Sequence, residues 1–271
     1  MSKPKGSRSI WALCFFLAGL LLAAFGLLFV CLKAYWVAKY RGEGANLRGA
    51  ILVLAPLASA DLHAAQLQQA NLRGADLRSA RLHSANLAGA DLTGANVTQT
   101  FFIGANLQGA RLRGVIGRPG TLAAADLRGA DLTGVDLTGT VLHRAHVDAM
   151  TKLEPKWRRV WELLALGGEG RDLRGIDLRG AELAGVRLPD ARLSDADLRW
   201  AYLEGAHLHG ADMRHAALVE ADLIGADLTG ADLSRADLRR VRLADARYDR
   251  QTRWPRGFDP RLHGAKRIES R

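Results

Sequence analysis

Through most of the chain a leucine stands at every fifth position, usually two residues after an alanine. The series runs in one phase from Leu47 to Val147 and resumes in a shifted phase from Leu173 to Tyr248. Leucine fills 31 of these 37 positions. An α-helix would spread such leucines around its circumference, and an uninterrupted strand would turn alternate repeats to opposite faces. Short extended segments separated by bends keep every alanine–leucine pair on one side. The pattern therefore predicts an all-β solenoid with a leucine and alanine core.

The unit resembles the pentapeptide-repeat family, whose repeat is A-(D/N)-L-x-x. Ala75, Asp76 and Leu77 begin one clear example, and residues 226–230 form another. The resemblance implies a right-handed, quadrilateral β-helix with four units in each coil, interrupted here by one amphipathic helix. We expect the structural core to include Leu47, Leu67, Leu87, Phe102, Leu127, Leu178, Leu203 and Leu228.

Residues 150–170 interrupt the repeat. Four apolar side chains in this segment recur at the spacing of one helical face: Trp157, Val160, Trp161 and Leu164. The spacing predicts an amphipathic helix whose tryptophans either cover an exposed coil end or bind a partner. Whether this helix loops out of one continuous stack or joins two stacks is left open by the sequence.

The N-terminal region is strongly apolar, with no charged side chain between residues 10 and 32. As a helix this run would reach about 34 Å, enough for a bilayer core of about 30 Å, whereas the apolar part of a signal peptide is shorter. The sequence thus predicts a transmembrane helix over residues 10–36 and a single-pass membrane protein that contacts the lipid bilayer through Ile10–Leu32. Sidedness is left open, with a lean towards a cytoplasmic N-terminus. Gly19 and Ala23 are spaced as in helix pairs, so a homo-oligomer is kept as an alternative.

The net charge of +10 is concentrated at the two ends of the chain. Residues 1–41 carry six Lys or Arg and no acid, and residues 249–271 carry seven Lys or Arg against three acids. The repeats between them are nearly neutral. A basic face that binds nucleic acid is therefore not required, and no nucleic-acid partner is predicted.

Motifs that carry chemistry are missing from the sequence. There is no glycine-rich phosphate loop, nucleophile elbow or metalloprotease helix. The aspartates recur because the unit recurs, and His207, His209 and His215 would need further ligands from neighbouring coils to hold a metal. We expect no enzyme and no catalytic, cofactor or metal site.

The predicted organisation has six parts, and the helical insert and the tail resemble those of some bacterial membrane-anchored family members. These parts are a basic tail (1–9), a transmembrane helix (10–36), a first repeat block (45–149), a helical insert (150–170), a second repeat block (171–250), and a C-terminal cap with a basic tail (251–271).

The function predicted from the sequence is a membrane-anchored, non-enzymatic scaffold that presents a rigid β-helix to an unknown protein partner. Candidate partner contacts are the aromatic residues Phe101, Trp157, Trp161, Trp200 and Tyr202. Binding of a glycan or lipid on a flat face is the alternative. The resemblance also implies a further alternative, a DNA mimic that modulates a type II topoisomerase. Mimicry of DNA needs a strongly negative surface, which the nearly neutral repeats do not supply.

Overall fold

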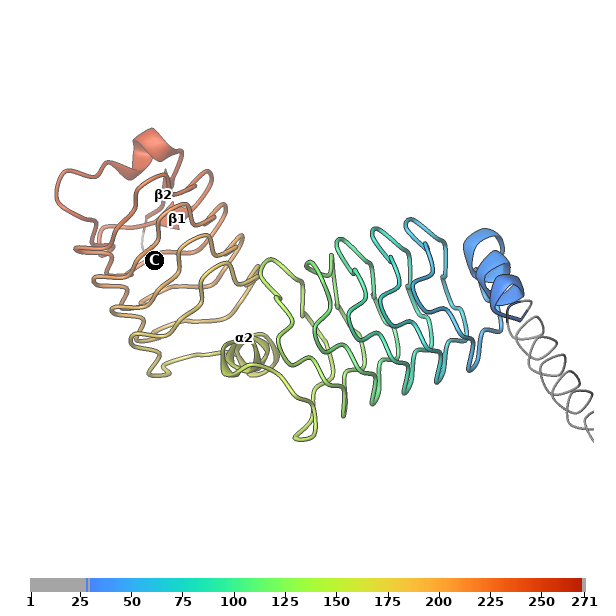
Figure 1. Ribbon diagram of the computed structural model, residues 1–271. Helices are drawn as coiled ribbons and strands as arrows, with labels where there is room; N and C mark the ends of the chain where they lie inside the picture. Colours follow the sequence, from blue (N-terminus) through green and yellow to red (C-terminus); the bar gives the residue numbers. More distant parts are fainter. Residues whose placement is uncertain (1–27, 29, 270–271) are drawn as a thin grey trace, which may run out of the picture.

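The computed structural model describes residue 28 and residues 30–269, which wind into a long stack of coils (Figure 1). Regular elements are few among these residues. A helix at the N-terminal end covers residue 28 and residues 30–40. The others are α2 (Pro155–Leu166), β1 (Arg247–Tyr248), the 3₁₀ helix η1 (Pro260–His263) and β2 (Lys266–Arg267), with β1 and β2 paired in parallel.

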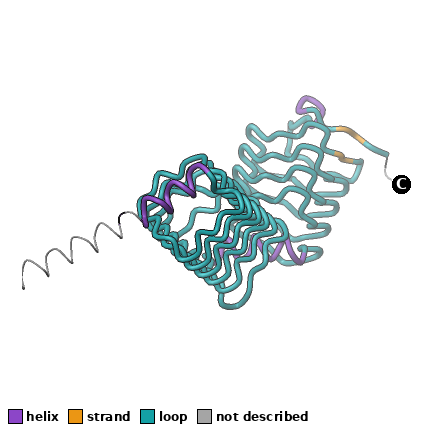
Figure 2. Tube along the Cα trace, turned by 90° about the vertical axis from the view of Figure 1, so that its right-hand side faces the viewer, coloured by secondary structure: helices purple, strands orange, loops and turns teal. Residues whose placement is uncertain are grey.

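Backbone pairing between residues 20 positions apart holds each coil to the next. Asn46 pairs in parallel with Gln66, and Gln66 pairs with Asn86. The N–H of Leu47 donates to the carbonyl oxygen of Gln66 at 2.7 Å, and the same bond recurs coil after coil. Four five-residue units therefore complete one turn of the stack that Figure 2 shows in cross-section. The predicted four-sided β-helix is confirmed.

Each bend needs one residue with a left-handed backbone. Gly49 has φ of 63°, and Ser79 adopts nearly the same conformation with φ of 55°. The following alanine then closes the bend, as where the N–H of Ala50 donates to the carbonyl oxygen of Leu47 at 3.0 Å. Glycine adopts this conformation without a steric penalty, which explains why it is so common at this position.

The leucines and alanines of the repeat form the core. Leu47 is 4% exposed, and the other seven residues expected in the core are fully buried. The alanines two positions earlier, such as Ala65 and Ala85, are also fully buried. Burying one leucine side chain contributes about 1.5–3 kcal/mol before the opposing chain entropy, so the stacked columns dominate the stability of the fold.

Both repeat blocks end in the same Asp-x-x-Thr turn. Asp148 and Thr151 close the first block, and Asp249 and Thr252 close the second. In each turn an aspartate carboxylate oxygen accepts the N–H of the threonine, at 2.8 Å and 3.0 Å respectively. Each threonine hydroxyl donates at 2.9 Å to a carbonyl oxygen of the preceding coil. The two turns therefore tie down the end of each block by the same network.

The turn lengthens its coil by one residue. Asp131 pairs with Lys152, and Asp232 pairs with Arg253, so the partners are 21 rather than 20 positions apart. This extra residue is the physical origin of the phase shift between the two repeat blocks.

At the junction of the two blocks, α2 replaces part of one coil. Directly after α2, the N–H of Gly168 donates to the carbonyl oxygen of Arg187 in the second block at 2.8 Å. Elsewhere the two blocks bond directly to each other, since the N–H of Gly139 in the first block donates to the carbonyl oxygen of Gly180 in the second block, also at 2.8 Å. The blocks thus touch directly at one place and hold α2 between them elsewhere, and their axes are inclined (Figures 1 and 2).

The face of α2 that points into the junction carries Trp157, Val160 and Leu163, all buried. Trp161 and Leu164, which the sequence pattern placed on the same stripe, are only half-buried. The buried face differs from a simple stripe because α2 lies between two coil ends and contacts both. Pro155 begins the helix, and Gly167 with φ of 71° ends it.

The two ends of the stack are covered. At the C-terminal end, an aromatic series packs over the last coil. Its ring centroids are 5.6 Å apart between Tyr248 and Trp254, 5.5 Å between Trp254 and Phe258, and 4.7 Å between Phe258 and His263. At the N-terminal end, the helix at residues 30–40 covers the first coil. Such caps shield apolar coil ends and unpaired edges.

The predicted membrane span requires correction. Most of residues 10–36 lie outside the part of the chain that the structure describes. Its described portion, residue 28 and residues 30–36, belongs to the N-terminal helix, where Ala34 and Tyr35 pack against the repeat core. Nowhere in residue 28 and residues 30–269 is there a helix with the length and apolar character to cross a bilayer. This finding contradicts the predicted single-pass membrane localisation.

Replacing Thr252 by valine tests the closing turn. Valine preserves the shape but removes the hydroxyl that donates to the carbonyl oxygen of Leu228 and accepts the N–H of Asp249, and it leaves that buried N–H without a partner. We expect Thr252→Val to lower the free energy of unfolding by about 1–3 kcal/mol, measured by urea denaturation. Thr229→Val is the matched control, because the Thr229 hydroxyl bonds only to the half-exposed Asp227 and its loss should cost about 0.5 kcal/mol or less. Equal losses in the two variants would contradict this role of the turn.

Candidate functional site at the junction of the repeat blocks

The five aromatic candidates lie at three places. Trp157 and Trp161 belong to α2 at the junction, and Trp200 and Tyr202 project from the second block next to it. Phe101 lies in the first block, where its ring stacks on His83 with centroids 5.7 Å apart. The structure therefore brings Trp200 and Tyr202 together and leaves Phe101 apart from them.

The two tryptophans of α2 differ in what they can contact. Trp157 is only 6% exposed, and Lys156 Nζ lies 4.7 Å from its ring centroid. Its ring packs between the coil ends, so it has almost no surface for a partner. Trp161 is half-buried and donates its Nε1–H to the carbonyl oxygen of Ala145 at 2.7 Å.

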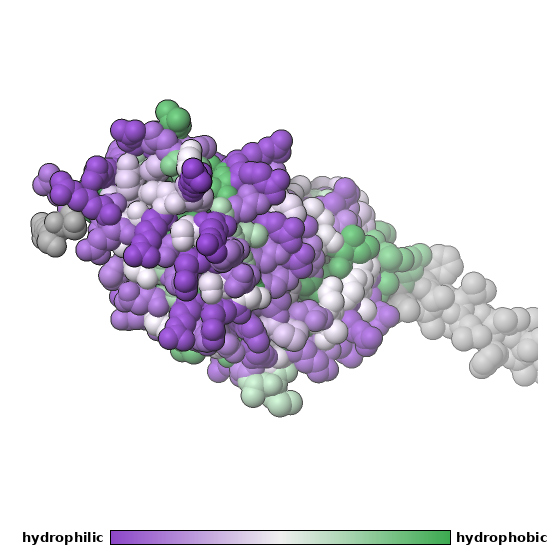
Figure 3. All heavy atoms as spheres, turned by 90° about the vertical axis from the view of Figure 1, so that its left-hand side faces the viewer, coloured by the Kyte–Doolittle hydropathy of each residue, from purple (hydrophilic) through white to green (hydrophobic). Residues whose placement is uncertain are grey.

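A cleft of about 450 Å³ opens where the two blocks meet directly, and we call it the Trp200 cleft. It is lined by Arg118, Thr138, Lys156, Arg179, Gly180, Trp200 and Tyr202. Trp200 and Tyr202 are 51% and 46% exposed. The surface seen from the C-terminal side is largely hydrophilic (Figure 3).

Trp200 occupies the left-handed position of its bend, with φ of 58°. Bulky side chains are uncommon in that conformation, which costs on the order of 1–3 kcal/mol. Packing of the Trp200 ring offsets little of this energetic cost, because the ring stays half-exposed. It lies beside the Arg199 guanidinium, whose carbon is 5.6 Å from the ring centroid. The backbone thus holds a large ring at the surface at a cost in stability.

The cations of the cleft are paired with aspartates. Arg118 Nε lies 2.7 Å from Asp136, and Arg179 lies 2.8 Å from Asp177. Lys156 Nζ lies 3.5 Å from Asp177 and donates to the carbonyl oxygen of Arg179 at 2.8 Å. The Arg179 guanidinium and, further off, Lys156 hold the pKa of the Asp177 carboxyl well below its usual range. These carboxylates stay ionised at neutral pH and suit binding rather than proton transfer. The sequence pattern did not indicate these cations, because they meet only across the phase shift.

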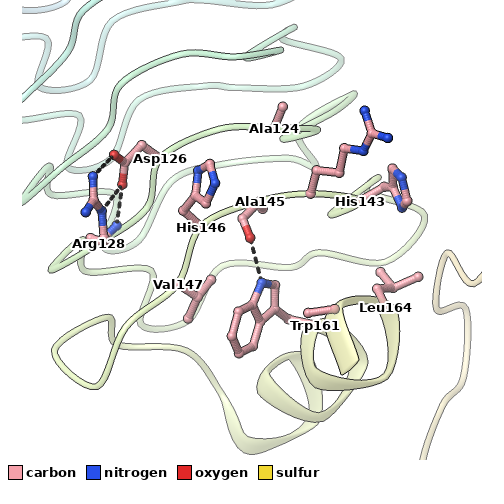
Figure 4. A pocket seen from close by; sticks show the side chains of 11 residues that line it. Ala124, Asp126, Arg128, His143, Ala145, His146, Val147, Trp161 and Leu164 are labelled. Atoms are coloured by element: carbon pink, nitrogen blue, oxygen red, sulfur yellow. Dashed lines mark hydrogen bonds and ion pairs between the residues drawn. The ribbon is translucent and has the colours of Figure 1, made fainter. Parts of the chain in front are cut away.

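A second, larger hollow of about 870 Å³ lies between α2 and the last coils of the first block (Figure 4), and we call it the junction groove. Its lining includes apolar side chains from α2 and from the 143–147 segment, together with two histidines and two arginines. On one wall, Arg128 forms two short bonds with Asp126, of 2.9 Å and 2.6 Å. Arg128, helped by Gln108, lowers the pKa of Asp126 to about 2.

Glu182 lines a small neighbouring hollow with Val141 and Leu164. Burial raises the pKa of its carboxyl, and the nearby Glu204 and Asp222 add to the effect by repulsion, although the N–H of Ala184 donates to it at 3.2 Å. An ionised Glu182 is therefore a destabilising feature of the junction at neutral pH.

Metal ligands do not gather at either site: in the described part of the chain, no three His, Cys, Asp or Glu side chains are grouped so that they could hold an ion. The junction supplies aromatic surface, hydrogen-bond donors and paired charges.

Comparison with known sequences gives a clear family match. Eight copies of the model for pentapeptide repeats match residues 43–78, 60–99, 80–116, 121–148, 172–210 and 206–245. No curated protein matches the chain.

Similar solved structures are also repeat proteins. HetL, a pentapeptide repeat protein involved in heterocyst differentiation regulation from the cyanobacterium Nostoc sp. strain PCC 7120, is 29% identical over 79% of this chain and 94% of its own, with a TM-score of 0.32. The pentapeptide repeat protein alr5209 from Nostoc PCC 7120 is 35% identical over 41% of this chain and 94% of its own, with a TM-score of 0.31. QnrB1, a plasmid-mediated fluoroquinolone resistance protein, is 19% identical over 70% of this chain and 85% of its own, with a TM-score of 0.33.

The half-buried carboxyl of Glu182 predicts a pH-dependent gain in stability when its charge is removed. Folding raises the pKa of Glu182 above its ordinary value of 4.5. The protonated carboxyl therefore contributes its full stability at a pH below 4.5, and this contribution is lost as the pH rises through the pKa of the folded state. Glu182→Gln should therefore melt above the unmodified protein at pH 7, by on the order of 2 °C, and the difference should vanish below about pH 4.5. Thermal melts across pH would show this. The exposed Glu169→Gln serves as control, and a Glu182→Gln variant that melts lower at pH 7 would refute the assignment.

Proposed function

This chain belongs to the pentapeptide repeat family, and from that premise we propose that it is a non-enzymatic scaffold that binds a partner protein through the Trp200 cleft. The two repeat blocks supply a rigid support on either side of the junction. The junction supplies the recognition surface, with Trp200 and Tyr202 as its main contacts.

The observation that carries this proposal is the exposed Trp200 in a left-handed bend. Most bends in the described repeats place glycine or a small or polar residue at this position. A large ring there costs stability and packs poorly, so its presence favours a role outside the folded chain. Tryptophan, tyrosine and arginine are also the residues that most often dominate binding energy at protein interfaces.

The chemistry of the cleft indicates what the partner presents. The two rings that line the cleft provide apolar surface for an apolar side chain of the partner. Around it, the ion pairs of Arg118 and Arg179 leave further N–H groups for carbonyl and carboxylate oxygens of the partner. A protein segment with one apolar anchor flanked by acceptor groups fits this lining, and a second copy of this chain is the alternative occupant.

In this proposal the other predicted parts of the chain have structural roles. Residues 45–149 and 171–250 are the two repeat blocks, residues 150–170 set the angle between them, and residues 251–271 protect the end of the second block. Phe101 and Trp161 are assigned secondary contacts, whereas Trp157 acts by holding α2 in place.

Site-specific photo-cross-linking tests the proposal. A benzoylphenylalanine in place of Trp200 should give one discrete cross-linked product in cells that make the protein, identified by mass spectrometry and reproduced with the purified partner. Adding Tyr202→Ala should reduce the yield roughly tenfold or more, as expected for an interface hot spot.

Arg240 provides the matched control position. It occupies the same place in its bend as Trp200, with φ of 57°, and is exposed two coils away. Benzoylphenylalanine at Arg240 should not yield the product. The proposal fails if both positions give the same products or if Trp200 gives none, and a product of twice the chain mass would identify the partner as a second copy.

A further inference from the structure

The junction groove is formed by two unrelated parts of the chain. One wall is the last coil of the first block, from His143 to Val147, and the other is the outer face of α2 with Trp161, Leu164 and Ala165 (Figure 4). Its volume of about 870 Å³ lies within the range of about 300–1,000 Å³ typical of ligand sites, which are often found where structural units meet.

The floor of the groove is apolar. Val147, Trp161 and Leu164 are each half-buried and contribute carbon surface. The only polar atom of the Trp161 side chain already donates to the carbonyl oxygen of Ala145. The indole therefore offers a ligand its hydrocarbon surface, which favours an apolar group at this end of the groove.

The rim of the groove carries an uncompensated positive charge. Arg128 and Asp126 neutralise each other through their paired bonds. Arg144 is exposed, and among the described residues it has no ion-pair partner. His143 and His146 add imidazole groups that can donate hydrogen bonds, and Asp126 is the only acid in the lining. An anionic ligand is favoured over a neutral or cationic one.

We propose that the junction groove binds a carboxylate attached to an apolar body of up to about two side chains. The Arg144 guanidinium pairs with the carboxylate, assisted by an imidazole N–H of His146. The apolar body lies on Trp161 and Leu164. Two sources offer this chemistry: a free aliphatic or aromatic acid, and the C-terminal residues of a peptide.

This site is independent of the Trp200 cleft, because the two share no lining residue. Loss of partner cross-linking at Trp200 would leave the groove proposal untouched, and failure of the groove to bind acids would leave the scaffold proposal untouched.

Titration calorimetry on the full chain tests the inference with three probes. These are 4-phenylbutyrate, N-acetyl-Leu-Phe with a free carboxylate, and the same dipeptide with a C-terminal amide. At least one acid should bind with a dissociation constant below 1 mM, roughly −4 kcal/mol on the standard scale. The amide should bind roughly tenfold or more weakly, because a charge-assisted pair is lost.

Three variants locate the binding. Arg144 has φ of 59°, so Arg144→Asn removes the charge with a residue that tolerates this backbone, and it should weaken acid binding about tenfold. Arg235→Asn is the matched control, with φ of 67° in an equivalent exposed bend of the second block, and should leave binding unchanged. Ala165→Trp, at an exposed position of α2, should fill the groove and abolish binding without lowering the melting temperature.

The relative affinities of the two acids identify the source of the ligand. Tighter binding of the dipeptide acid points to a peptide C-terminus, and tighter binding of phenylbutyrate points to a free small acid. The proposal is overturned if neither acid binds below 1 mM, if the amide binds as tightly as the acid, or if Arg144→Asn and Arg235→Asn have the same effect.

Discussion

The whole molecule depends on one geometric constraint: each coil must place its backbone groups opposite those of the next coil, 20 residues on, while its leucines fall into the same interior columns. The bond from the N–H of Leu47 to Gln66, repeated along the stack, and the burial of side chains such as Leu67 satisfy both conditions at once. An extra residue inside a block would break this match. One extra residue is found instead at each block end, where the network of Thr151 or Thr252 accommodates it and a capping element follows.

The same constraint explains why the junction differs from the rest of the surface. Along the regular faces, aspartate and arginine two positions apart pair with each other, as do Asp76 and Arg78 at 2.7 Å. Such exposed pairs recur along the faces and each contributes little stability. Where α2 replaces part of a coil, side chains from both blocks and the helix converge without the regular pattern. The two hollows that we propose as binding sites therefore lie where the repeat is broken.

Much of the fold could be predicted from the sequence because its cause is local. The leucine at every fifth residue is enough to predict that Leu203 and its equivalents are buried. The number of four units per coil, by contrast, was implied by the family resemblance. The site could not be predicted in the same way. Arg118 and Trp200 become neighbours only through the phase shift and the contact of Gly139 with Gly180. Trp157 resembled a contact residue, but α2 buries it. The Asp-x-x-Thr pattern occurs at the end of both repeat blocks in the sequence. The pattern alone does not indicate that the threonine hydroxyl bonds to the preceding coil.

Disulfide trapping tests the central geometry most directly. In a chain with Cys14 and Cys31 replaced by serine, cysteines at Asn86 and Asn106 occupy directly paired positions on adjacent coils. Their Cα atoms should be close to the strand spacing of about 4.8 Å, within the range for a disulfide. Mild oxidation should cross-link this pair quickly, whereas cysteines at Asn86 and Phe101 or at Asn86 and Arg111 should stay reduced. Preferential cross-linking of either of the last two pairs would contradict a coil of four five-residue units and the account built on it.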